Sequence, residues 1–214
     1  MSLGRTAWEL RSRLIGPERV ITGDQVKALR RFDVLGLRAR ARIRALHLRE
    51  LVLGSAENAR IPVGHTLVEL GSGHDFPVDW KAFAEIFGST QYAVSFTDAR
   101  VLDVGAHKGY FGAFALASGA AVVLSFEPAA KNYEALERAA KPLGDRWHTR
   151  NAALGSTPGR GTLLLATTLW AHSLVEVEKP AGEQAVSIVT FEQALDALPA
   201  RGSRCTDHRR VRRG

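Results

Sequence analysis

The sequence predicts an α/β protein in which helices pack over a sheet of parallel strands. Two short stretches, 101–104 and 121–126, are apolar almost throughout, as strands covered on both faces must be. A segment rich in small residues at 110–118 separates them and ends at Gly119, which is typical of a helix closed by glycine. Two strands joined through a helix are parallel, so these three segments predict one crossover unit.

The front part of the chain, residues 1–60, is expected to be a mainly helical, arginine-rich extension. Thr6 and Glu9 have capping-box spacing, and Asp24 is expected to cap a second helix. Arginine alternates with alanine or isoleucine at 38–44; the period fits an exposed strand and the composition fits a helix, so both remain open. A solvated helix face is the favoured interpretation of these arginines, and contact with RNA, acidic lipid or an acidic partner is the alternative.

Residues 61–200 are expected to form the main domain, which begins with β structure. The stretches 61–63 and 66–70 predict a hairpin. Asp79 is expected to cap a short helix that carries an aromatic stripe on one face. The stripe is interpreted as core and not as a substrate pocket, and it comprises Trp80, Phe83, Ala84 and Phe87.

Apolar patterns and turn residues define the later elements of this domain. They are a helix at 131–141 and strands at 147–154, 162–165 and 186–189. The last two strands predict a β excursion in place of a second crossover. Thr190 with Gln193 has capping-box spacing and predicts a final helix that ends at Pro199.

The turn after the first parallel strand and the end of the second strand carry the clearest chemistry. Gly105 allows a turn that a side chain would block, and Gly109 is expected to let the backbone come close to a ligand. Glu127 follows the second strand, so its two oxygens are expected to accept hydrogen bonds from both hydroxyls of a ribose. This arrangement predicts a site for a nucleoside cofactor.

The composition of the turn distinguishes between cofactors. A dinucleotide site uses G-x-G-x-x-G to bring backbone amides to a pyrophosphate, whereas residues 103–109 read D-x-G-x-x-x-G with His107 at the second glycine position. S-adenosylmethionine has no phosphate and carries a positive sulfonium and a positive ammonium group, so Asp103 is favourable beside it. The turn therefore favours S-adenosylmethionine, and a NAD-dependent oxidoreductase is the alternative.

Through these motifs the chain resembles the FkbM-type S-adenosylmethionine-dependent methyltransferases. The shared segments are V-L-D-V-G-A-H-K-G-Y-F at 101–111, S-F-E-P at 125–128 and N-A-A-L-G at 151–155. The first two motifs are common to many class I methyltransferases. The resemblance implies a Rossmann-like class I methyltransferase sheet and methyl transfer to a hydroxyl oxygen of a small molecule or a sugar.

The turn and the resemblance together define the expected site. The expected cofactor-binding residues are Asp103, Gly105, Ala106, His107, Gly109, Glu127 and Asn151. His107 is expected either to touch the carboxylate of the cofactor or to cap the following helix. His172 is a candidate general base for the acceptor hydroxyl, although a loop histidine without that role is the favoured interpretation. No metal site is expected, and Lys108→Ala is expected to have a mild effect.

Charge is distributed unevenly along the chain. Residues 1–50 hold 12 Lys and Arg against 5 Asp and Glu, residues 51–200 hold 11 against 16, and residues 201–214 hold 6 against 1. The acidic central part argues against nucleic acid as a partner, and a non-catalytic module that binds nucleic acid through the basic ends is a second alternative. One cysteine, Cys205, and the lack of any long apolar run fit a cytoplasmic enzyme with no membrane segment.

Residues 201–214 are expected to be a disordered basic tail. In the family that the chain resembles, the helix corresponding to 190–198 leads into an apolar strand of the form L-K-I-D-x-E-G and then into further strands. The tail here has one large apolar residue, Val211, so we expect an incomplete catalytic domain from a truncated or frame-shifted gene. The strand at 101–104 would then be an unpaired edge, which predicts self-association and little or no methyl transfer.

Overall fold

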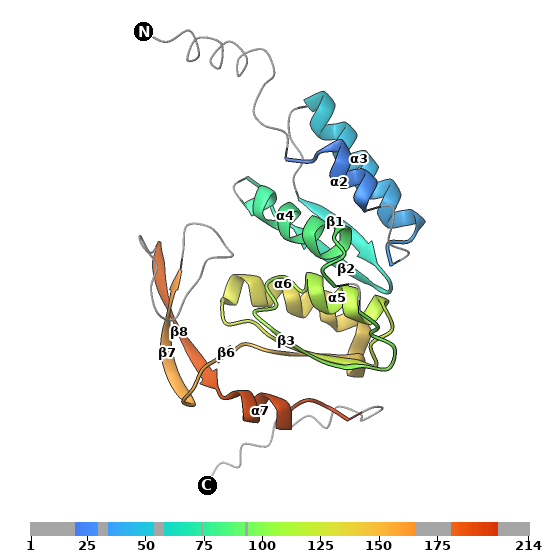
Figure 1. Ribbon diagram of the computed structural model, residues 1–214. Coiled ribbons are helices and arrows are strands. Elements are labelled where there is room, and N and C mark those ends of the chain that lie inside the picture. Colours follow the sequence, from blue (N-terminus) through green and yellow to red (C-terminus); the bar gives the residue numbers. More distant parts are fainter. Residues whose placement is uncertain are drawn as a thin grey trace, which may run out of the picture.

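The computed structural model describes residues 20–200 except 30–33, 54–57, 74, 93 and 166–180 (Figure 1). These residues form a three-stranded parallel sheet with helices on both faces, a β-hairpin with further helices beside it, and a second three-stranded sheet. The predicted α/β, Rossmann-like arrangement is confirmed. The predicted basic tail lies outside the described residues, and the division of the chain near residues 60 and 200 stays a prediction.

The parallel sheet contains β3 (Arg100–Val104), β4 (Val122–Phe126) and β5 (Trp147–Arg150) in that order. Both neighbouring pairs are parallel, and Asp103 lies opposite Ser125 in the register. All five residues of β4 are buried because this strand is central and both of its faces are covered. β3 is at one end of the sheet, so its outer edge has no strand partner among the described residues.

Helices cover the two faces of the parallel sheet. α5 (Tyr110–Ala117), the helix expected between the first two strands, lies on one face together with α6 (Ala130–Ala140). α7 (Phe191–Asp196) lies on the opposite face (Figure 1). The predicted capping box of α7 is confirmed, because the Thr190 side chain accepts from the amide of Gln193 and the Gln193 side chain accepts from the amide of Thr190.

The predicted hairpin and aromatic core helix lie beyond α5 and α6. β1 (Ala59–Val63) and β2 (Thr66–Leu70) are antiparallel, and α4 (Asp75–Gly88) follows them. The aromatic stripe of α4 is core, as predicted: the rings of Phe83 and Phe87 stack with centroids 4.5 Å apart, and both side chains are fully buried. The hairpin and α4 both contact α5, which begins at the end of the loop after β3.

Among the described residues, the helices that precede the hairpin are α2 (Gly23–Ala28) and α3 (Leu37–Leu53). The cap of α2 differs from the prediction: Thr22 and Gln25 form a capping box, whereas Asp24 lies within the first turn. The expected capping pair further upstream, at residues 6 and 9, lies outside the described residues.

The alternating arginine stretch is helical and forms part of α3. Ala39, Ile43 and Leu46 are buried at helical spacing, and α3 contacts β1. Arg38 and Arg42 are exposed, which agrees with a solvated helix face. No helix in the described ranges is long and apolar enough to span a membrane.

The second sheet contains β6 (Ala153–Leu154), β7 (Gly159–Leu165) and β8 (Gly182–Val189) in the order β6-β8-β7. β7 and β8 are antiparallel and extend away from the parallel sheet, which confirms the predicted β excursion (Figure 1). The single strand predicted at 147–154 is instead two strands. The chain leaves the parallel sheet at Asn151 and continues as β6 in the second sheet.

Candidate functional site

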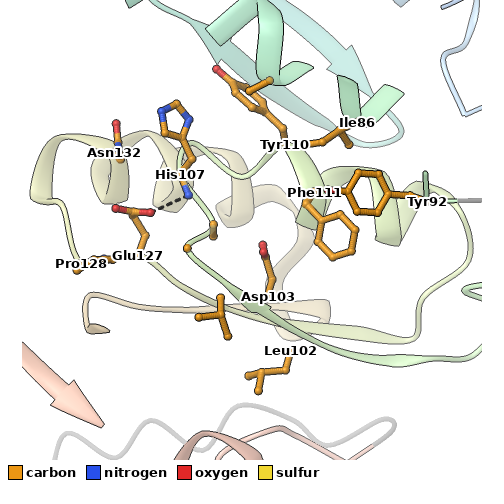
Figure 2. A pocket seen from close by; sticks show the side chains of 14 residues that line it. Ile86, Tyr92, Leu102, Asp103, His107, Tyr110, Phe111, Glu127, Pro128 and Asn132 are labelled. Atoms are coloured by element: carbon orange, nitrogen blue, oxygen red, sulfur yellow. Dashed lines mark hydrogen bonds between the residues drawn. The ribbon is translucent and has the colours of Figure 1, made fainter. Parts of the chain in front are cut away.

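A cavity of about 520 Å³ opens at the carboxyl ends of β3 and β4, beside the loop that joins β3 to α5 (Figure 2). Its polar side chains are those of Asp103, His107, Glu127 and Asn132. The other lining residues are Ala82, Ile86, Tyr92, Leu102, Val104, Gly105, Ala106, Tyr110, Phe111 and Pro128. Five of the seven predicted cofactor residues therefore line one cavity.

The loop between β3 and α5 has left-handed backbone at three positions. Gly105, His107 and Gly109 have φ values of 76°, 52° and 88°. A Cβ at Gly105 would meet no atom within 4 Å, so the space beside this glycine belongs to the cavity. The amides of Gly105 and Ala106 both donate to the carbonyl of Phe126, at 2.9 Å each, and fix the loop against the end of β4.

Glu127 directs its carboxylate toward this loop from the end of β4. Its Oε2 accepts from the amide of His107 at 2.7 Å, and its Oε1 accepts from the amide of Ala129 at 2.9 Å. Burial raises the pKa of Glu127, while these two amides and the side chain of Asn132 lower it. A carboxylate has about four acceptor positions, so further hydrogen bonds from a ligand can be added.

Asp103 is the second buried acid at the cavity. Burial raises its pKa to about 7, the hydroxyl of Ser125 lowers that pKa, and the nearby charge of Glu127 raises it. The Ser125 hydroxyl donates to Asp103 Oδ2 at 2.9 Å, and the indole of Trp147 donates to the Ser125 oxygen at 2.9 Å. The indole therefore orients the hydroxyl toward Asp103. A cation in the cavity would favour the charged carboxylate.

Two predicted cofactor residues do not line the cavity. A Cβ on Gly109 would lie 2.9 Å from Leu136 and 3.0 Å from the ring of Trp147, so this glycine is required by packing. Its predicted role beside a ligand stays a prediction. Asn151 donates its side-chain amide to the carbonyl of Glu127 at 2.8 Å and to the next carbonyl at 3.1 Å, so it fixes the turn that carries Glu127.

His107 lies at the wall of the cavity. The N-cap position of α5 belongs to Gly109, so His107 does not cap this helix, which was one of its two expected roles. Its ring centroid lies 5.6 Å from that of Tyr110, and its side chain is 15% exposed. Its contact with a bound ligand stays a prediction.

A buried ion pair that the sequence analysis missed lies behind the loop. Lys108 Nζ is 2.5 Å from Asp79 Oδ2, and the two side chains are 6% and 0% exposed. The same carboxylate accepts from the amide of Gly71 at 2.6 Å, and its other oxygen is 3.8 Å from His107 Nε2. Burial raises the pKa of Asp79, and the positive charge of Lys108 lowers it.

This pair corrects two expectations. Asp79 does not cap α4, which begins four residues earlier, at Asp75. The structure also gives no basis for a mild effect of Lys108→Ala, because the substitution would leave a buried carboxylate without its partner. Spacing was the available signal: Asp79 is one turn before Phe83, so it shares the buried face of α4 and requires a polar partner.

The end of the cavity away from Glu127 is apolar. Tyr92 and Phe111 pack there with ring centroids 5.1 Å apart, and Ile86 of α4 lies beside them (Figure 2). Asp103 and the loop separate this end from the polar end. One cavity thus offers hydrogen-bond acceptors at one end and an apolar surface at the other.

The candidate base His172 lies outside the described residues, as does Cys205. Within the described ranges, no three His, Cys, Asp or Glu side chains gather closely enough to hold a metal ion.

The residues of the cavity suit a nucleoside that carries positive charge, as S-adenosylmethionine does. Glu127 has acceptor capacity for ribose hydroxyls at the end of β4. Asp103 would be stabilised in its charged form by a cation, and a side chain at Gly105 would fill the space beside the loop. The polar end of the cavity suits the nucleoside of such a ligand, and the apolar end leaves room for its reacting group and an acceptor.

Comparisons with known proteins give partial structural likenesses. No family model matches the chain, and no curated protein matches it significantly. One similar structure is described as an RNA methyltransferase from Pyrococcus horikoshii, with 19% identity, a TM-score of 0.29, and coverage of 34% of this chain and 36% of that one. A Thermoplasma acidophilum protein gives 16% identity, a TM-score of 0.27, and coverage of 34% and 39%. A protein-L-isoaspartate O-methyltransferase gives 15% identity, a TM-score of 0.31, and coverage of 60% of this chain and 41% of that one. In all three comparisons the match spans less than half of the other structure.

Proposed function

We propose that this chain binds S-adenosylmethionine as a class I methyltransferase of the FkbM type. The acceptor we propose is a hydroxyl oxygen of a small molecule or a sugar, which is what the resemblance of its motifs implies. The observation that carries the proposal is the placement of Glu127 at the end of β4, where it lines one cavity together with the loop between β3 and α5. A cytoplasmic location goes with this proposal.

Several of the predicted cofactor residues have a definite part in this function. Glu127 binds the ribose hydroxyls, and Gly105 with Ala106 forms the open side of the loop against which the amino-acid part lies. Asp103 supplies negative charge near the ammonium and sulfonium groups. Asn151 acts indirectly, because it holds the turn that presents Glu127.

The cofactor supplies a methyl group on a sulfonium, which is already a strong electrophile. The protein therefore has to align the acceptor oxygen with the methyl group and remove the hydroxyl proton where the acceptor requires it. Ile86, Tyr92 and Phe111 offer an apolar surface on which the body of an acceptor can rest. His172 stays the candidate for the proton acceptor.

The loop is less suited to the alternative, a NAD-dependent oxidoreductase. A dinucleotide site needs backbone amides directed at a pyrophosphate. Here the amides of Gly105 and Ala106 are bound to the carbonyl of Phe126, and the amide of His107 is bound to Glu127. Three successive amides are thus engaged within the protein.

Calorimetric titration of the purified chain with S-adenosylmethionine, S-adenosylhomocysteine and NAD tests the proposal. We expect both sulfur nucleosides to bind at one site and to compete with each other, and NAD to bind at least tenfold more weakly. Tighter binding of NAD would overturn the proposal in favour of the oxidoreductase. Binding of nucleic acid alone, with a steep loss of affinity as salt is added, would instead favour the basic binding module.

A further inference from the structure

The loop between β3 and α5 is held from two sides by different elements. On the β4 side, the amide of His107 donates to Glu127 at 2.7 Å. On the α4 side, the side chains of both His107 and Lys108 face Asp79, with Lys108 Nζ 2.5 Å from Oδ2 and His107 Nε2 3.8 Å from Oδ1. The two middle residues of the loop therefore converge on one buried carboxylate.

We propose that the Asp79–Lys108 ion pair positions the cofactor loop. It holds the loop in the left-handed form in which the amide of His107 meets the carboxylate of Glu127. Neither member of the pair lines the cavity, so both act through the loop and through Glu127. The inference depends on the proposed function only where cofactor affinity is the readout.

The conformation of the loop requires such an anchor. His107 is not a glycine, yet its φ is 52°, and it stands between two glycines that are also left-handed. A side-chain-bearing residue remains in this strained region only where surrounding contacts define its position. Lys108 is the next residue, and its ammonium is fixed at 2.5 Å from a wholly buried carboxylate. The ion pair therefore fixes the residue next to the strained backbone of His107.

The pair is also connected to the hairpin. Asp79 accepts from the amide of Gly71, the residue after β2, at 2.6 Å. One carboxylate thus joins α4, the end of the hairpin and the loop. A buried ion pair adds little net stability compared with an apolar pair of the same volume. The contribution of Asp79 and Lys108 is therefore the fixed direction of their charge-assisted hydrogen bonds, which sets the position of the loop.

Three variants separate positioning from stability. Lys108→Met keeps the length of the side chain but leaves the buried Asp79 without its ion-pair partner. The double variant Asp79→Asn/Lys108→Met removes both charges and retains an oxygen that can accept from Gly71. Lys131→Met is the matched control, since Lys131 forms an exposed pair with Asp75 at 2.8 Å.

Three quantities are measured for each variant: the unfolding temperature, hydrogen exchange of peptides covering 104–110 in the ligand-free protein, and the dissociation constant of S-adenosylmethionine. We expect both Lys108 variants to exchange these loop amides at least tenfold faster than the wild type and to bind the cofactor at least tenfold more weakly. The double variant should regain most of the unfolding temperature that Lys108→Met loses, because no unpartnered charge remains buried. Lys131→Met should match the wild type in exchange and affinity.

The proposal is overturned if the double variant regains wild-type loop exchange together with its unfolding temperature, because the pair would then be purely structural. It is equally overturned if Lys108→Met leaves exchange of the loop unchanged. If Lys108→Met does not fold, the double variant decides the question. A wild-type chain that binds no S-adenosylmethionine would refute the proposed function, whereas loop exchange in the ligand-free protein would still decide this inference.

Discussion

The two acids of the cavity differ in how their surroundings support negative charge. Glu127 accepts from two backbone amides, which favour its charged form against the effect of burial. Asp103 has the hydroxyl of Ser125, and burial raises its pKa to about 7. Glu127 therefore suits neutral donors such as hydroxyls, whereas Asp103 changes charge near neutral pH and responds to a cation.

Glu127→Ala is expected to weaken S-adenosylmethionine binding roughly ten- to a hundredfold. The substitution removes charge-assisted hydrogen bonds worth on the order of 1.5 to 3 kcal/mol. It also leaves the amides of His107 and Ala129 without their acceptor, so the unfolding temperature should fall as well. Calorimetry measures the affinity, with Glu137→Ala on the exposed side of α6 as the control. Unchanged affinity in the Glu127 variant would remove this residue from the site.

Gly105→Val should abolish cofactor binding. The residue has a φ of 76°, which a β-branched residue tolerates poorly, and its side chain would enter the open space of the cavity. Gly73→Val is the matched control, because Gly73 is also left-handed, with φ of 55°, and a Cβ there meets nothing within 4 Å. The control shares the backbone strain but does not line the cavity. If both variants lost the same affinity for the cofactor, backbone strain alone would explain the loss. If Gly105→Val bound the cofactor normally, Gly105 would not belong to the site.

Asp103→Asn should change the pH dependence of stability. Because the folded pKa of Asp103 is about 7 and that of an unfolded aspartate is about 3.9, the folded state binds the extra proton between these values. The wild type should therefore lose stability as pH rises from about 4 to 7, by up to roughly 1.4 kcal/mol per pH unit. The variant cannot titrate at this position. The unfolding temperature of the variant minus that of the wild type should therefore rise across that range and then level off. A difference that stays constant with pH would contradict the raised pKa of Asp103.

Apolar runs with one clear pattern were predictable from the sequence, whereas the arginine alternation at 38–44 left strand and helix open. The buried positions of α3 follow a helical spacing, and the stretch is a helix. The apolar run of β4 likewise marked a strand covered on both faces. The division of the strand predicted at 147–154 was not predictable, because it follows from hydrogen bonds that Asn151 makes to carbonyls after β4. Such contacts join residues that are distant in the sequence.

Residues of the candidate site were predictable where the local backbone or the end of a strand calls for a particular residue type. Gly105 and Glu127 were identified from the turn and from the end of the strand, and both line the cavity. Gly109 shows the limit of this reasoning, because its glycine is needed for contact with Trp147, which belongs to β5. The partner of Lys108 was also hidden, since α4 approaches the loop only in the folded chain. A local sequence pattern can thus predict the conformation of a segment, but the residues that it contacts in the folded chain cannot be read from that pattern.

The close approach of α5 to β5 gives a prediction for packing. A Cβ on Gly112 would lie 2.5 Å from the ring of Trp147, so Gly112→Ala forces the two elements apart. We expect a loss of roughly 1 to 3 kcal/mol in the free energy of unfolding, partly offset by the better helix propensity of alanine. Denaturant unfolding measures this loss. Gly23→Ala, within α2 where a Cβ meets nothing within 4 Å, is the control and should not be destabilised.

The parallel sheet has two edge strands among the described residues, β3 and β5. β4 is central and entirely buried, whereas β3 has a partner on one edge only among the described residues. Leu102 and Val104 of β3 line the cavity. Little or no methyl transfer, even when the cofactor binds, stays a prediction.

β3 is an edge strand among the described residues, and we expect the chain to associate with itself through it. An apolar strand with unpaired backbone groups is a template for pairing with another strand, and two copies can join through it into one continuous sheet. Sedimentation velocity should show a dimer or larger species whose share rises with protein concentration. Val104→Lys places a charge on this strand at a side chain that is 53% exposed, so it should shift the chain toward the monomer without disturbing the core. Val94→Lys, at a residue that is 65% exposed and outside the strands, should leave the association unchanged. A wild-type chain that stays monomeric at every concentration, or an equal effect of the two substitutions, would show that β3 is not the surface of association.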